Sequence, residues 1–192
     1  VILEDPLNEN ILYAGGLRGV YLSLDKGAHW SYLGNKFPGA AVADMEIHYA
    51  TMNLVAATHG RGIYMVNLKP IHELAKRSFP TEKGYLFPVE DALLPWFQTF
   101  SGKPIFETIN KSMISFWLKS EDSVMLSVRD KANKTIWSAS LKGRKGFNQF
   151  QWDLIIKRSE SGLPYFTRYE TYLRAGEYKI ALSGKDIFDE RS

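Results

Sequence analysis

A chain of 192 residues with 45% hydrophobic and 14% aromatic side chains is too apolar for a disordered protein, and it is long enough for one large or two small domains. Its net charge of +3 includes no Lys/Arg run typical of nucleic-acid binding, so we expect no nucleic-acid partner. The absence of cysteine excludes disulfides and thiolate metal sites, and no apolar run approaches the ~18 residues of a membrane span.

An internal repeat fills the first third of the chain. Residues 10–21 align without gaps on residues 53–64, an offset of 43 residues. Periods of about 40–50 residues with several short strands per unit indicate β-propeller blades, so we assign residues 1–69 to two blades. The predicted strands, four in the first copy and three in the second, are Ile2–Glu4, Ile11–Ala14, Val20–Leu24, Trp30–Leu33, Asp44–His48, Leu54–Thr58 and Ile63–Asn67.

A turn motif of the form Ser-x-Asp-x-Gly-x-x-Trp stands between the last two strands of the first copy. Ser23 and Asp25 can accept hydrogen bonds from backbone N–H groups of the turn. Gly27 can adopt the positive φ that such a turn needs. Trp30 is expected to begin the return strand as a large apolar anchor. The motif predicts a structural role for Asp25 rather than a catalytic one.

Residues 70–104 predict a packed strap rather than a flexible linker. They contain five of the eight prolines and six aromatic rings, and burying each ring is worth about 1.5–3 kcal/mol. Within the strap, Pro70–Arg77 predicts a short helix, with proline in its first turn and Ile71 and Leu74 on one face.

Residues 105–185 predict a β-sandwich. Apolar and polar residues alternate with period two in six or seven short strands, the pattern of an immunoglobulin-like fold. Residues 159–169 read as a surface insertion, whose Tyr165 and Phe166 we expect to cover a partner surface. Residues 186–192 read as an exposed polar tail. The expected fold class is therefore all-β: the last two blades of a β-propeller followed by an immunoglobulin-like β-sandwich.

The ordered motifs resemble the BNR-repeat, or Asp-box, β-propeller proteins, which include sialidases and sortilin-like receptors and are often labelled secreted glycosyl hydrolases. Residues 5–30 resemble their repeat, Thr58–Tyr64 their closing blade and Leu86–Ala92 the segment after it. Gly146–Asp153 and Ala175–Ile180 resemble their C-terminal sandwich, which is similar to that of flagellar hook-capping proteins. The family's proteins are much longer, so the resemblance implies a C-terminal portion of a bacterial protein that is secreted, periplasmic or on the cell surface.

The resemblance implies a non-catalytic binding or scaffolding role, with a glycan or a protein as ligand and the remaining blades or another chain as partner. The alternative is part of a glycoside hydrolase whose active site is completed by upstream blades. A third reading is a secretion or surface-anchoring module. Whether the parent protein is an enzyme stays open, since the family label follows from the repeat and not from a shared catalytic set.

Two turns of the repeat are the candidate ligand contacts. Arg18 and Arg61 are repeat equivalents in the turns that join the second and third strands of each blade, at the end opposite the Asp-box. Paired arginines bind a substrate carboxylate in sialidases, but each could instead stabilise its own turn or pair with a neighbouring blade. His59 lies in the second turn without another ligand at metal-binding spacing. We therefore predict no catalytic residue, no metal and no cofactor.

Overall fold

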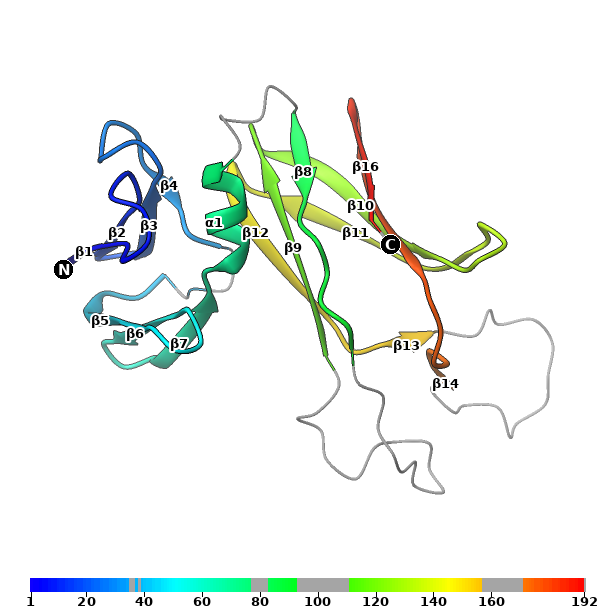
Figure 1. Cartoon of the computed structure of the whole chain (residues 1–192), viewed down its shortest axis with the longest axis horizontal. Helices are drawn as coiled ribbons and strands as arrows, with labels where there is room; N and C mark the ends of the chain where they lie inside the picture. The colour runs from blue at the N-terminus through cyan, green and yellow to red at the C-terminus, as the bar shows by residue number, and fades with distance from the viewer. Residues whose placement is uncertain (35–36, 38, 77–82, 93–110, 157–170, 192) are drawn as a thin grey trace, which may run out of the picture.

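The computed structural model describes residues 1–34, 37, 39–76, 83–92, 111–156 and 171–191 (Figure 1). Within these ranges the chain forms antiparallel sheets and one helix, which confirms the predicted all-β class. The expected strand near 105–109, the insertion at 159–169 with Tyr165 and Phe166, and the strap between 93 and 104 lie outside the described residues.

The repeat forms two antiparallel sheets, one from each copy. The order in the first is β1-β2-β3-β4 and in the second β5-β6-β7, so each strand pairs with its neighbour in the chain. The numbers of strands agree with the sequence prediction. Their bounds are β1 (Ile2–Glu4), β2 (Leu12–Gly16), β3 (Gly19–Ser23), β4 (Ser31–Tyr32), β5 (Val42–His48), β6 (Asn53–Thr58) and β7 (Gly62–Asn67).

The two sheets share one hydrophobic core. Tyr13 and Leu22 of the first sheet and Leu54 of the second are at most 2% exposed and belong to the same cluster. Strand alternation places these residues on one face of each sheet, and their burial brings the faces together. Strands β2 and β5 approach each other closely, since a Cβ added to Gly15 would lie 2.7 Å from Val42 Cγ1.

The predicted short helix is confirmed as α1 (Lys69–Lys76). Pro70 lies in its first turn, where a missing N–H removes no helical hydrogen bond. Ile71 and Leu74 are 0% and 2% exposed and belong to the hydrophobic core that the two repeat sheets share. Within the described ranges, no helix has the length and apolarity required to cross a membrane.

The second half of the chain forms two sheets of order β12-β9-β8 and β11-β10-β15-β16, with a separate pair β13-β14. Leu86 and Phe116 of the first sheet and Leu126 and Leu182 of the second share a second buried core. The strands are β8 (Gly84–Leu86), β9 (Ser112–Leu118), β10 (Asp122–Arg129), β11 (Thr135–Gly143), β12 (Gly146–Trp152), β13 (Ile155–Ile156), β14 (Thr171–Tyr172), β15 (Lys179–Gly184) and β16 (Ile187–Arg191).

The predicted polar tail is wrong, because residues 187–191 form β16. Asp189 Oδ2 accepts hydrogen bonds from Leu86 N at 2.9 Å and from Arg191 Nη2 at 2.7 Å. Arg191 Nε donates to Leu86 O at 3.1 Å. These contacts join the edge of β16 to β8 of the other sheet. The charges that suggested a solvated tail are therefore partners of another strand.

The two halves meet along β4 and β12 (Figure 1). Gly34 N donates to Phe147 O at 3.1 Å, and Leu33 forms a parallel bridge with Phe147. The Arg144 guanidinium lies 5.7 Å from the centre of the Tyr32 ring, within cation–π range. Phe147 is 1% exposed and belongs to the core of the first half. The halves are consequently packed together, and do not merely follow each other along the chain.

Candidate functional site

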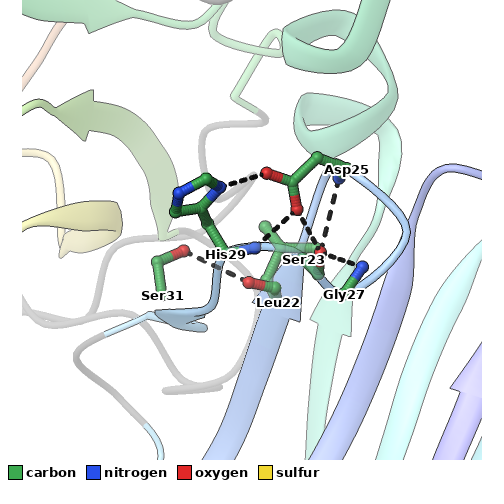
Figure 2. Close-up of polar contacts among 6 residues, drawn as sticks. All are labelled: Leu22, Ser23, Asp25, Gly27, His29 and Ser31. Carbon is green, nitrogen blue, oxygen red and sulfur yellow. Dashed lines mark hydrogen bonds and ion pairs between the residues drawn. The ribbon is translucent and has the colours of Figure 1, made fainter.

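The Asp-box turn is fastened by side-chain hydrogen bonds, as Figure 2 shows. Ser23 Oγ accepts the N–H groups of Asp25 and Gly27 at 3.3 and 2.8 Å, and it donates to Asp25 Oδ1 at 2.8 Å. Asp25 Oδ1 also accepts the His29 N–H at 2.8 Å. Lys26 and Gly27 have φ of 56° and 90°, and the second value favours glycine. The motif predicted these acceptors and this glycine.

The chemistry of Asp25 is that of a structural carboxylate. The backbone N–H of His29, the His29 ring at 2.7 Å and the Ser23 hydroxyl stabilise its charged form and lower its pKa to about 2. A catalytic general acid needs the opposite shift. His29 was missed by the sequence analysis because it occupies a variable position of the motif.

Trp30 lies just before the return strand that it was expected to begin. Its side chain is 40% exposed, and the return strand begins one residue later, at Ser31. The indole lies beside the turn: a Cβ added to Gly27 would lie 3.6 Å from Trp30 Cζ2. Trp30 thus covers the glycine of its own turn without entering the core between the sheets.

The two candidate ligand turns are exposed. Arg18, His59 and Arg61 all lie at the surface, in the β2–β3 and β6–β7 connections. Neither guanidinium makes an ion pair or hydrogen bond with another described residue. The Arg18 carbonyl accepts a hydrogen bond from Tyr32 Oη at 2.7 Å, and the His59 N–H donates to Ala41 O at 2.9 Å. Hydrogen bonds thus hold the backbone of both turns, while the three side chains share no common partner among the described residues.

A cavity of about 700 Å³ lies at the junction of the two halves. It is bounded by α1, by residues 87–92, by the start of β9 and by Gln149 of β12. Its volume is in the range of small-molecule sites, which occur preferentially where structural units meet. Three polar side chains of its wall, Ser112, Ser115 and Gln149, are only 5–6% exposed.

One wall of this cavity contains a histidine fixed by a buried carboxylate. His72 of α1 lines the cavity, and its Nε2 lies 2.8 Å from Asp5 Oδ2. The same oxygen accepts the Tyr13 hydroxyl at 2.7 Å, and Asp5 Oδ1 accepts the Leu7 N–H at 2.9 Å. Burial, and then the bond to Asp5, raises the pKa of Tyr13 above its ordinary value. The Asp5 side chain is fully buried, so this cluster joins α1 rigidly to the first sheet.

The rim of the cavity is charged, with both signs balanced. Lys69 Nζ lies 3.1 Å from Glu90 Oε1 and connects α1 to the segment after β8. Lys76 Nζ lies 3.1 Å from Glu73 Oε1 on the helix itself. Lys111 and Asp91 also line the cavity, and so the described lining residues contribute three cations and three carboxylates.

The sequence analysis missed this cavity and its histidine. Asp5 and His72 are separated by 67 positions, so no local motif relates them. Among the described residues, no cluster of three or more His, Cys, Asp or Glu is arranged to bind a metal ion.

Comparisons of this chain with models of protein families, with curated proteins and with solved structures find no match.

Proposed function

We propose that this chain is a non-catalytic binding and scaffolding unit of a secreted protein of the BNR-repeat, or Asp-box, β-propeller kind, and that its ligand is a glycan or a protein. In this proposal the β1–β4 and β5–β7 sheets are consecutive blades, and the sheets of the second half are an immunoglobulin-like sandwich. The 43-residue repeat and the hydrogen-bonded Asp-box turn support it.

The observation that carries the proposal is the exposed outer face of the β5–β7 sheet. Ile63 and Met65 of β7 are 74% and 67% exposed, and they pair across the sheet with Ala57 and Val55 of β6. Among the described strands β7 has no second neighbour, so its outer edge has unpaired backbone groups. Exposed Asp44 and Glu46 of β5 lie on the same face, so its apolar part is next to the free edge of β7. A further blade would pack on this part of the sheet.

The acidic residues near the cavity favour binding over glycoside hydrolysis. The side chains of Glu73 and Glu90 are 47% and 72% exposed, and each is paired with a lysine. A glycosidase acid requires a carboxyl group shielded from water, opposed by a second carboxylate across the scissile bond. Asp25, the acid of the Asp-box motif, is already hydrogen-bonded to the backbone and ring of His29 within its own turn.

The test compares the association of the chain with that of an outer-face variant. We expect sedimentation velocity to show self-association of the wild type as concentration rises through the micromolar range. The double variant Ile63→Glu, Met65→Glu should be monomeric with an unchanged melting temperature. Leu17→Glu is the matched control, because Leu17 is 84% exposed in the β2–β3 turn, away from this face.

Two results would overturn the proposal. A wild type that stays monomeric at every concentration would remove the scaffolding role of the outer face. Hydrolysis of any member of a panel of chromogenic glycosides by the chain would remove the non-catalytic assignment.

A further inference from the structure

The inner wall of the junction cavity includes polar side chains of residues that are almost fully buried. Ser112 is 6% exposed, and its hydroxyl has no hydrogen bond to another described residue. Gln149 Nε2 donates to Ser115 Oγ at 3.4 Å, a long and weak hydrogen bond. Buried polar groups normally have good partners, so the Ser112 hydroxyl can gain a hydrogen bond from a ligand that enters the cavity.

His72 offers the cavity a hydrogen-bonding group of fixed orientation. An ionised carboxylate only accepts, so the contact with Asp5 requires the proton of His72 to be on Nε2. The other ring nitrogen, Nδ1, has no partner among the described residues. Because Asp5 also binds Tyr13 and the Leu7 backbone, the ring has little freedom to turn. Nδ1 is thus the ring nitrogen that can form a hydrogen bond with a hydroxyl group of a ligand.

The charges around the cavity favour a ligand without net charge. The three lysines and three carboxylates among its described lining residues balance, and two of each are already paired. An anion or a cation would have to compete with these pairs. Apolar atoms of Met52, Pro88 and Met113 line the remaining wall and suit the C–H faces of a ligand.

We infer that the junction cavity binds a neutral, hydroxyl-rich molecule, a mono- or disaccharide, and that His72 Nδ1 accepts a hydrogen bond from one of its hydroxyl groups. Serine and carboxamide groups can both donate and accept, as sugar hydroxyls require. The inference extends the proposed binding function to a site distinct from the outer face of β5–β7. The two proposals can therefore fail separately. A wild type that stays monomeric would contradict the scaffolding role of the outer face but not sugar binding in the cavity.

The test is saturation-transfer NMR on the whole chain with glucose, galactose, N-acetylglucosamine and lactose as probes, with acetate, phosphate and glycine as charged controls. We expect at least one sugar to bind and none of the charged probes to bind more tightly. A second arm presents the bound sugar as the terminal unit of an oligosaccharide. Binding of the free sugar indicates a soluble ligand, binding of the oligosaccharide alone indicates a glycan end, and both support the inference.

Two variants locate the binding. Met113→Trp should fill the cavity and weaken sugar binding at least about tenfold, whereas Met125→Trp should not. The second is a matched control, because Met113 on β9 and Met125 on β10 are 40% and 48% exposed and only Met113 lines the cavity. His72→Gln keeps an N–H near the position of Nε2 for Asp5 but removes Nδ1, so binding should fall about tenfold while the melting temperature is retained.

The inference is overturned if no sugar binds, or if acetate, phosphate or glycine binds more tightly than every sugar. It is also overturned if the two tryptophan variants weaken binding equally, because the sugar would then lie elsewhere. Should His72→Gln fail to fold, the comparison of Met113→Trp with Met125→Trp still decides the location.

Discussion

At the scale of single residues, Ser23 and Ser31 form a matched pair in one hairpin (Figure 2). Ser23 is 1% exposed and makes three hydrogen bonds within the turn, whereas Ser31 makes one bond of 3.4 Å to Leu22 O. We expect Ser23→Ala to lower the free energy of unfolding by about 1–3 kcal/mol, because buried donors lose their acceptor. Ser31→Ala should cost less than about 0.5 kcal/mol. Urea unfolding measures both, and equal effects would contradict a fastening role for Ser23.

Asp25 predicts a defined pH dependence. Its folded-state pKa is about 2, below the ordinary value of 3.8, so its contribution to stability is complete above the ordinary value and is lost as the pH falls toward 2. Asp25→Asn has no carboxylate to protonate. The wild type should therefore be the more stable protein at neutral pH, and the gap between the two should close between about pH 4 and 2.

Urea unfolding at a series of pH values measures this gap. Glu121→Gln is the control, because Glu121 is exposed and has no ion pair or hydrogen bond with another described residue. A gap between wild type and Asp25→Asn that does not change with pH would show that the charge of Asp25 contributes nothing to the turn.

The residues that the sequence predicted correctly are those with local partners. Ser23, Asp25 and Gly27 interact within one turn, so a short motif contains all the relevant information. His72 and Asp5 are 67 positions apart, and their contact depends on how α1 packs against the first sheet. A single sequence has no signal for such a pair. The cavity, whose walls come from both halves, is unpredictable for the same reason.

At the scale of elements, the contact between β2 and β5 depends on the absence of a side chain at Gly15. Gly15→Ala would place a Cβ 2.7 Å from Val42 Cγ1 and force the two sheets apart, so we expect a loss of about 1–3 kcal/mol. Thermal and urea unfolding measure it. Adding Val42→Ala should recover part of the loss, because it removes the clashing methyl group.

The control for this contact is Gly39→Ala. A Cβ at Gly39 would meet nothing within 4 Å, so the substitution should have little effect. If Gly15→Ala lowered the free energy of unfolding no more than Gly39→Ala, the two sheets would not be in tight contact at Gly15.

Strand positions were more predictable than strand partners. Alternation and the repeat predicted β5, β6 and β7 to within two residues, because both signals are written along the chain. The pairing of β8 with β9 and the contacts of β16 with β8 depend on segments far apart in sequence. The acidic composition near the C-terminus therefore suggested a tail where a strand forms.

At the scale of the whole molecule, one of the two buried clusters contains residues of both halves. Phe87, Trp117 and Phe147 of the second half lie in the same buried cluster as Tyr13 and Leu54 of the first. The rings of Phe87 and Phe147 are 5.6 Å apart at the junction. Because apolar burial is the main favourable term in folding, a shared core couples the stability of the halves.

This coupling predicts that Phe147→Ala destabilises both halves together. Phe147 is 1% exposed, so its loss should cost about 3–5 kcal/mol, through lost burial and the cavity left behind. Hydrogen exchange should accelerate by a similar factor in β6, in the first half, and in β10, in the second, if both open only in global unfolding. Phe188→Ala is the control, since Phe188 in β16 is 66% exposed and should cost less than about 0.5 kcal/mol. Faster hydrogen exchange in β10 with no change in β6 would show that the halves unfold independently. Their contact would then join two domains that are each stable on their own.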